Sequence, residues 1–282
     1  MLTASFIAAK GMTEELERLL WAKGIATWAL AREHAAEVHE ALGGQRAARL
    51  LDHLAAAEAA RGRGDGAWFA AHWPAEHAWR LWRGWCDDDP AQIGLLDIET
   101  TGLTAGIDQV TVAGLVCGPR ARAFVAGAPQ EGHEPLDRFP EAVRGLRLLA
   151  TFNGGNFDLP FLERHFRAVN LRFDLPHIDW MPPARAAGLS GGLKDMERQL
   201  GLARADEIKD VRGLGAIQLW ATWRSQGDLA AYRRLTSYCL ADCANLRPFG
   251  DAIYQRLWDR THGAHVRHVD FAAIKGQQQT LF

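Results

Sequence analysis

The sequence predicts an α/β domain with a mixed sheet flanked by helices, preceded by a small all-α region. Three observations lead to this fold class. Residues 1–90 carry apolar side chains at three- and four-residue steps and show no strand pattern. After the acidic, proline-marked segment CDDDPAQ, short β-rich runs begin. Further along the chain these runs alternate with amphipathic helical patterns, which favours a sheet with helices on its faces.

The N-terminal region contains four predicted helices, at 13–25, 27–42, 45–62 and 74–85. The first of them has the clearest ends. Thr13 precedes a run of acidic residues and favours a helix start, whereas Gly24 favours a stop. We therefore expect a helical region over residues 1–90.

The second region contains four predicted strands, at 94–99, 109–117, 121–126 and 147–152. A helix is expected around FDLPFLERHFRAV and another around GLKDMERQLG, with helices continuing to about residue 260. The chain then becomes polar and ends in QQQTLF. These patterns predict an α/β domain over residues 91–262 and a polar tail over 263–282.

Composition and charge exclude several classes of protein. The 282 residues are 48% hydrophobic and 23% charged, as in an ordinary globular protein. A net charge of -2 argues against coating nucleic acid by positive charge alone, although local arginines and metal ions can still meet phosphates. No signal peptide or membrane span is expected. Four cysteines without a regular framework fit a reduced, cytoplasmic protein.

Two acidic residues end the first predicted strand. Asp97 and Glu99 stand at i and i+2, so the two-residue period of a strand points both carboxylates to one face. A metal ion could bridge them. The alternative is an ordinary strand end running into the turn TTGL, where acidic residues are common.

Three further polar residues lie in predicted helices later in the chain. Asp158 comes after a predicted strand and a Gly-rich turn, at the first turn of a helix, where the alternative is an ordinary N-terminal Asp favoured by the helix dipole. Tyr238 and Asp242 are four residues apart in a helical run and share one helix face, where the alternative is a solvated surface.

The order of these motifs is more specific than any one of them. D-x-E at a strand end, NGxxFD, and YxxxD in a late helix resemble the DnaQ-like, ribonuclease H-fold 3′-5′ exonucleases of the DEDDy class. The similarity is carried by LLDIETTGL, FNGGNFDLPFL and YCLADCANL. The resemblance is closest to the YprB-like branch, and it extends through HIDW and SGGLKDMERQLG. It covers roughly residues 93–250 and implies a ribonuclease H-like mixed sheet.

The resemblance also implies a two-metal-ion mechanism. Hard Mg²⁺ or Mn²⁺ ions prefer oxygen ligands, which suits carboxylates better than Cys or His. By this resemblance Asp97, Glu99 and Asp242 hold the ion that activates water, Asp97 bridges to the second ion, and Asp158 supports that ion directly or through water. Tyr238, with an ordinary pKa near 10, is better suited to orient the attacking water than to act as a base.

Six residues are candidate substrate contacts. The segment after the first two acids is expected to pack against the 3′-terminal nucleotide, with Leu103 as an apolar wedge, although turn packing is the alternative. The other candidates lie in the same segment, in the turn before Asp158 and after a Gly-Gly turn: Thr100, Thr101, Asn153, Phe157 and Lys194. Structural packing for Phe157 and simple solvation for Lys194 are the alternatives.

Two weaker signals concern the ends of the chain. Residues 5–30 resemble a degenerate helix-hairpin-helix, in which only Gly11 of the expected glycine pair is present. The terminal QQTLF resembles the peptide by which bacterial proteins dock on the DNA polymerase sliding clamp. It would offer Leu281 and Phe282 as apolar anchors and Gln278 as a hydrogen-bonding group.

The predicted function is therefore 3′-5′ exonuclease activity on DNA, with single strands as the expected substrate, in repair or replication. An exoribonuclease is the first alternative, since nothing in the motifs reads the sugar. A catalytically silent nucleic-acid-binding or clamp-associated adaptor is the second, and the intact acids argue against it.

Overall fold

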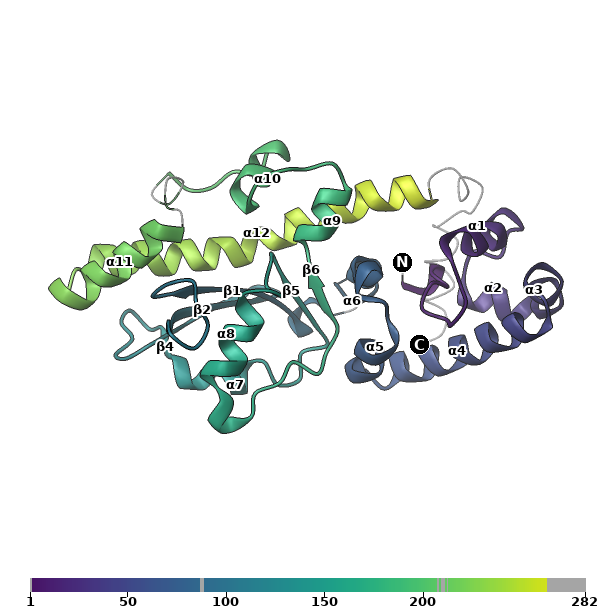
Figure 1. Cartoon of the computed structure of the whole chain (residues 1–282), viewed down its shortest axis with the longest axis horizontal. Coiled ribbons are helices and arrows are strands. Elements are labelled where there is room, and N and C mark those ends of the chain that lie inside the picture. The colour runs from purple at the N-terminus through teal and green to yellow at the C-terminus, as the bar shows by residue number, and fades with distance from the viewer. Residues whose placement is uncertain (1, 87–88, 207, 209–210, 212, 263–282) are drawn as a thin grey trace. The chain divides into compact units, whose positions relative to one another are not determined.

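The structure is a computed structural model that describes residues 2–86, 89–206, 208, 211 and 213–262 (Figure 1). The described chain forms two compact units. One comprises Trp85–Ile253, and the other comprises the residues up to Gly84 together with those from Tyr254 onward. Within the part of the chain that the structure describes, no helix combines the length and apolar character of a membrane span.

The N-terminal unit is helical, as the sequence predicts. Its α-helices are α1 Glu14–Ala22, α2 Trp28–Glu33, α3 Ala35–Leu42, α4 Gly44–Gly62, α5 Gly66–His72 and α6 Trp82–Cys86, the last crossing into the next unit. Thr13 caps α1, since its side chain accepts a hydrogen bond from the Leu16 N–H at 3.3 Å. The helix expected over 27–42 is divided in two, because His34 leaves helical geometry between α2 and α3.

Aromatic side chains and one ion pair fill this unit. Trp21, Trp28 and Trp82 are fully buried, so they serve as core. Buried Arg80 pairs with buried Glu17 and also donates to the Ser5 hydroxyl at 3.0 Å. A buried charge is tolerated only when it is paired and hydrogen-bonded, and Arg80 meets both conditions.

The second unit is built on a six-stranded mixed sheet, which confirms the predicted fold class. The strands are β1 Ile93–Thr100, β2 Val110–Cys117, β3 Arg120–Val125, β4 Glu134–Pro135, β5 Leu148–Thr151 and β6 His177–Asp179. Their order is β4-β3-β2-β1-β5-β6. The pairs β1–β2 and β2–β3 are antiparallel, whereas β1–β5, β5–β6 and β3–β4 are parallel.

Helices cover both faces of the sheet. They are α7 Phe139–Ala142, α8 Asp158–His165, α9 Met181–Ala186, α10 Leu193–Gln199, α11 Gly213–Gln226 and α12 Leu229–His262. In Figure 1, α7 and α8 lie on one side of the sheet, and α11 and the long helix α12 lie on the other. Each side has its own core cluster, the first including Leu96, Ile98 and Phe161, the second including Val112 and Leu235.

Alternation along β1 decides which side chains face each layer. Leu96 and Ile98 belong to the core beneath α7 and α8. Because neighbouring strand residues point to opposite faces, Asp97 and Glu99 face the side occupied by α12. Two of the predicted acidic residues therefore lie on the face of β1 that is directed toward α12.

Candidate active site

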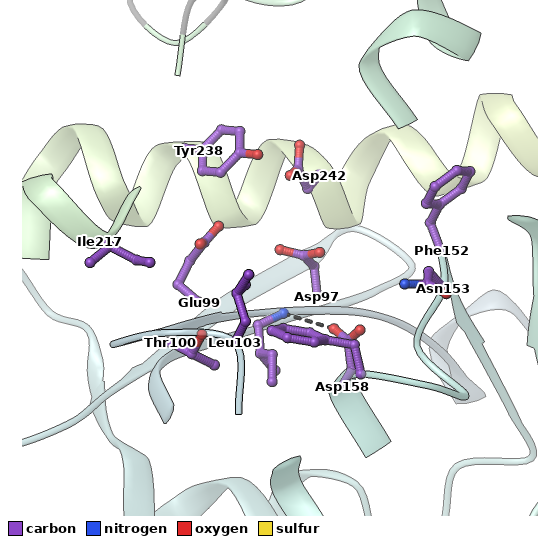
Figure 2. A pocket seen from close by; sticks show the side chains of 12 residues that line it. Asp97, Glu99, Thr100, Leu103, Phe152, Asn153, Asp158, Ile217, Tyr238 and Asp242 are labelled. Atoms are coloured by element: carbon purple, nitrogen blue, oxygen red, sulfur yellow. Dashed lines mark hydrogen bonds between the residues drawn. The ribbon is translucent and has the colours of Figure 1, made fainter. Parts of the chain in front are cut away.

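A cavity of about 200 Å³ opens where β1 passes under α12 (Figure 2). It is lined by side chains from β1 and its following loop, from the β5–α8 turn, and from α11 and α12. The lining residues are Asp97, Ile98, Glu99, Thr100, Leu103, Phe152, Asn153, Phe157, Asp158, Ile217, Tyr238 and Asp242. The structure thus brings together all four predicted acids and Tyr238, although they come from three distant parts of the chain.

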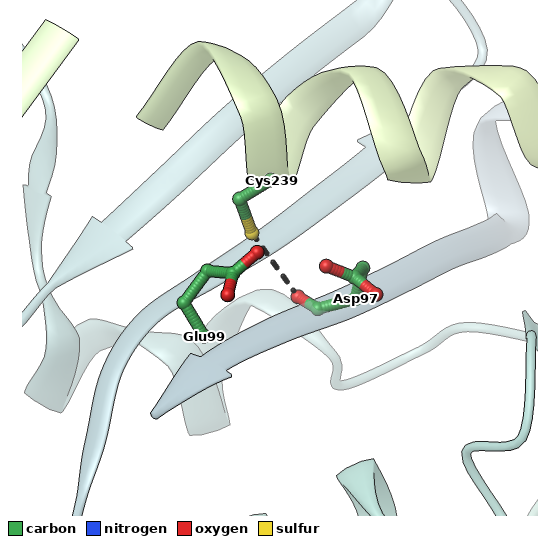
Figure 3. A group of neighbouring side chains, drawn as sticks. All are labelled: Asp97, Glu99 and Cys239. Carbon is green, nitrogen blue, oxygen red and sulfur yellow. Dashed lines mark hydrogen bonds between the residues drawn. The ribbon is translucent and has the colours of Figure 1, made fainter. Parts of the chain in front are cut away.

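Asp97 and Glu99 lie side by side on β1, and Figure 2 shows both carboxylates pointing toward α12. Asp97 is half-buried and Glu99 is buried. One carboxylate oxygen of each residue and the sulfur of Cys239 all lie within 4.8 Å of one another, close enough to share a metal ion (Figure 3). Asp158 and Asp242 line the same cavity outside this tight group.

Cys239 is better explained as a packing residue than as a ligand. Its thiol donates a hydrogen bond to the Asp97 backbone oxygen at 3.4 Å. Burial raises the pKa of this thiol well above its usual value, so it stays protonated, and a hard divalent cation prefers oxygen. Cys239 therefore joins α12 to β1.

Asp158 is tied directly to the strand that carries the other acids. It begins α8, as predicted, and is 4% exposed. Its Oδ1 accepts a hydrogen bond from the Ile98 N–H at 3.0 Å, drawn as the dashed line in Figure 2. Burial raises the pKa of Asp158 to about 7, although this bond from the backbone favours the ionised form.

Tyr238 and Asp242 project from one face of α12 into the cavity, as their four-residue spacing predicts. Figure 2 shows the Tyr238 hydroxyl directed toward Asp242. Burial, followed by the charges of Asp242 and Glu99, raises the pKa of Tyr238 far above its usual value. Tyr238 therefore keeps its proton, so its hydroxyl can donate a hydrogen bond and is unsuited to act as a base.

The electrostatics of the cavity suit a divalent cation. Burial raises the pKa of both Asp97 and Glu99 well above the usual range, and the charges of Asp242 and Asp158 raise it further. Carboxylates that repel one another in a buried site are stabilised when a cation lies between them. The donor set is made of hard carboxylate oxygens, which fits Mg²⁺ or Mn²⁺.

The turn before Asp158 is held by a residue whose role we did not predict. Asp179, at the end of β6, accepts hydrogen bonds from the backbone N–H groups of Asn153 at 2.7 Å, Gly155 at 3.2 Å and Met181 at 3.1 Å. Asn153 has a left-handed backbone with a φ of 63°. An acid at the end of a strand, in HIDW, is the sequence signal for such a turn anchor.

The structure separates the predicted substrate contacts into two groups. Thr100, Leu103, Asn153 and Phe157 line the cavity. Leu103 is 72% exposed, so its side chain is open to contact from a bound molecule.

Thr101 and Lys194 are not among the lining residues. The Thr101 hydroxyl accepts a hydrogen bond from the Gln109 N–H at 3.0 Å, within the loop after β1. The Lys194 ammonium lies 4.3 Å from the centre of the Tyr238 ring. Gln278, Leu281 and Phe282 lie outside the described residues. The structure adds Phe152 and Ile217 to the lining, and neither was among the six candidate contacts.

The raised pKa of Asp158 predicts how the stability of the metal-free protein depends on pH. Its folded pKa, about 7, lies above its ordinary value of 3.8. Between these values the folded state binds more protons than the unfolded state, so this group makes the protein less stable as pH rises. In Asp158→Asn, which keeps an oxygen for the Ile98 N–H, we expect a weaker loss of stability between about pH 4 and about pH 7.

Urea unfolding in the presence of EDTA at several pH values measures this effect. Asp137→Asn is the matched control, because Asp137 is exposed and belongs to the same unit. An Asp158→Asn variant with the same pH dependence as the parent would contradict the shift.

Comparison with known proteins bears on the same part of the chain. A family model described as RNase_H superfamily matches residues 95–254, which include every acid of the cavity. A solved structure described as "apo form of the nuclease" is similar over 60% of this chain and 75% of that chain, at 20% sequence identity and a TM-score of 0.40. The comparison with curated proteins gives no match.

Proposed function

The chain belongs to the RNase H superfamily, and from this membership we propose that it is a two-metal-ion 3′-5′ exonuclease of the DEDDy class, similar to the YprB-like branch. One observation carries the proposal. Four acids from three separate segments line a single cavity, where β1 passes under α12: Asp97, Glu99, Asp158 and Asp242. Their shared location and raised pKa values are expected of a site made for divalent cations.

The proposed reaction is hydrolysis of the phosphodiester at the 3′ end of a strand. Two Mg²⁺ or Mn²⁺ ions would supply the charge that activates water and that stabilises the phosphate and the leaving oxygen. Asp97, Glu99 and Asp242 would hold one ion, and Asp97 and Asp158 the other. Tyr238, protonated at its hydroxyl, would donate a hydrogen bond that orients the attacking water.

Apolar side chains beside the acids support a nucleotide as the substrate. Leu103, from the loop after β1, and Ile217, from α11, both line the cavity. A terminal base needs apolar contacts, whereas its phosphate needs the cations. Thr100, Asn153 and Phe157 complete the wall on the β1 and α8 side. We therefore propose that the last base packs against Leu103 and Ile217.

The direct test uses single strands labelled at the 3′ end or internally, with Mg²⁺ or Mn²⁺. We expect mononucleotides to be released from a DNA strand whose 3′ end is unmodified, and no release when that end is blocked. RNA is assayed alongside, since an exoribonuclease would prefer it. Cleavage of the blocked strand would refute the 3′-5′ polarity, and no cleavage of either polymer would favour the adaptor alternative.

DNA is favoured over RNA by the clamp-like tail, which we propose docks a bacterial sliding clamp through Gln278, Leu281 and Phe282 during repair or replication in the cytoplasm. Deletion of residues 278–282 is expected to abolish clamp binding, measured by calorimetry, and to leave nuclease activity on short strands unchanged. Clamp binding that survives the deletion would disprove the docking role.

A further inference from the structure

A buried ion network lies directly behind one of the cavity acids. Arg204 follows α10 in the chain and bridges Glu197 of that helix to Asp242 of α12. Its Nε donates to Glu197 Oε2 at 2.5 Å and its Nη2 donates to Glu197 Oε1 at 2.8 Å. Its Nη1 forms an ion pair with Asp242 Oδ1. The three side chains are 6%, 1% and 8% exposed for Arg204, Glu197 and Asp242.

The network is anchored at its far end as well. Asn245 donates from Nδ2 to Glu197 Oε1 at 3.1 Å. Asn245 stands three residues after Asp242, so both project from the same face of α12. Two connections thus join the α10 region to α12: Arg204 pairs with Asp242, and Glu197 accepts a hydrogen bond from Asn245. Arg204 cannot swing away without leaving Glu197 buried and unpaired, which is unfavourable.

A fixed arginine has a specific consequence for Asp242. A carboxylate has two oxygens and accepts several hydrogen bonds. With Oδ1 paired to Arg204, the plane and rotamer of the carboxylate are set, so the lone pairs that Arg204 does not use keep a fixed direction toward a cation, beside the hydrogen bond that Asp242 shares with Tyr238. Outer partners that orient a ligand in this manner commonly affect metal affinity without touching the metal.

We propose that Arg204 is a positioning residue that, anchored by Glu197, holds the Asp242 carboxylate in the orientation required to bind a divalent cation. This inference rests on the proposed function, because it assigns Asp242 as a ligand. It differs from a competing role in which Arg204 occupies the place of the cation. A competitor would weaken cation binding when present, whereas a positioning residue strengthens it.

Two variants test the positioning role at constant net charge. Arg204→Lys keeps the positive charge but lacks the planar fork that pairs with both Glu197 oxygens. The double variant Glu197→Gln with Arg204→Met removes one charge of each sign, so Glu197 is not left as a buried charge without its arginine, while Asp242 loses the group that orients it. Since neither variant alters the net charge near the cavity, a changed cation affinity reports geometry.

Binding of Mn²⁺ to the full chain, followed by calorimetry and by electron paramagnetic resonance of the unbound ion, is the readout. We expect both variants to bind Mn²⁺ about tenfold or more weakly than the parent. Thermal unfolding in EDTA identifies a temperature at which every variant is folded. Arg198→Lys is the matched control, because Arg198 lies on α10 next to Glu197, with an exposed side chain paired to Asp195, and the affinity of this variant should equal that of the parent.

The outcomes separate this inference from the proposed function. Variants that bind Mn²⁺ as tightly as the parent, or more tightly, overturn the positioning role and leave the nuclease proposal in place. A parent chain that binds no Mn²⁺ overturns both. Weakened binding in both variants, with an unchanged Arg198→Lys, supports Arg204 as a positioning residue.

Discussion

The Asp97→Asn variant is expected to lose metal-dependent nuclease activity by about a thousandfold or more, since two-ion sites contribute several kcal/mol and about 1.4 kcal/mol corresponds to tenfold in rate. Asp97 shares its strand face with Glu99, and the charges of Asp242 and Asp158 both act on it. Asp97 thus interacts with each of the other three acids, and a cation in the cavity would neutralise its charge together with theirs. The amide keeps the size of the side chain and removes its charge.

The measurement is the initial rate of mononucleotide release at saturating Mg²⁺ or Mn²⁺. The variant should remain folded, because loss of one charge relieves repulsion in a buried site. Asp137→Asn, an exposed substitution in the same unit, should keep the activity of the parent. If Asp97→Asn retains the parental rate, the activity comes from a contaminant or from another site, and the proposed active site is wrong.

Gly114→Ala is expected to displace α12 and to reduce activity although Gly114 is not among the residues that line the cavity. Gly114 lies on β2 opposite Asp97, under the helix that carries Tyr238 and Asp242. A Cβ at this position would lie 2.8 Å from the Cys243 sulfur and 2.9 Å from the Cys239 sulfur, closer than atoms normally approach. Overpacking of this kind typically costs about 1–3 kcal/mol of stability.

The loss of activity should be larger than the loss of stability implies. A displacement of α12 moves Asp242 away from the acids of β1, and a shift of about 1 Å in a catalytic group can cost up to about a hundredfold in rate. The rate at a temperature where the variant is fully folded measures this effect. An Ala at Gly114 that leaves both the rate and the unfolding midpoint unchanged would show that the helix does not depend on this close approach.

A compensating substitution distinguishes crowding from other causes. Replacing Cys239 and Cys243 by Ala in the Gly114→Ala background removes both sulfurs that the new Cβ would meet. This combination should regain part of the lost activity and stability. Gly62→Ala is the control, since a Cβ there meets nothing within 4 Å; its activity should equal that of the parent, and its stability should not fall, because alanine favours a helix more than glycine does.

Local periodicity was sufficient to predict several features of the fold and of the cavity. The i, i+2 spacing of Asp97 and Glu99 predicts one strand face, and the structure has both on the α12 side. The i, i+4 spacing of Tyr238 and Asp242 predicts one helix face, and both line the cavity. Such predictions succeed because the repeat of a strand or a helix is a property of the backbone over a few residues.

Other features depended on which segments meet across the fold. The ion pair of Arg204 with Asp242 joins residues 38 positions apart, and no spacing rule connects them. The need for glycine at position 114 arises only because two cysteines of α12 pack on that point of β2. Asp179 anchors the turn before Asp158 because β5 and β6 are neighbours in the sheet.

The difference between the features that local spacing predicts and those that depend on tertiary packing has a physical reason. Short-range sterics and hydrogen bonding set the direction of each side chain relative to its own strand or helix, and the order of residues encodes them directly. The orientation of a buried carboxylate, its pKa and its ion partners depend on burial and on charges contributed by distant segments. Those quantities take a value only once β1, α8, α10 and α12 have packed around the same cavity.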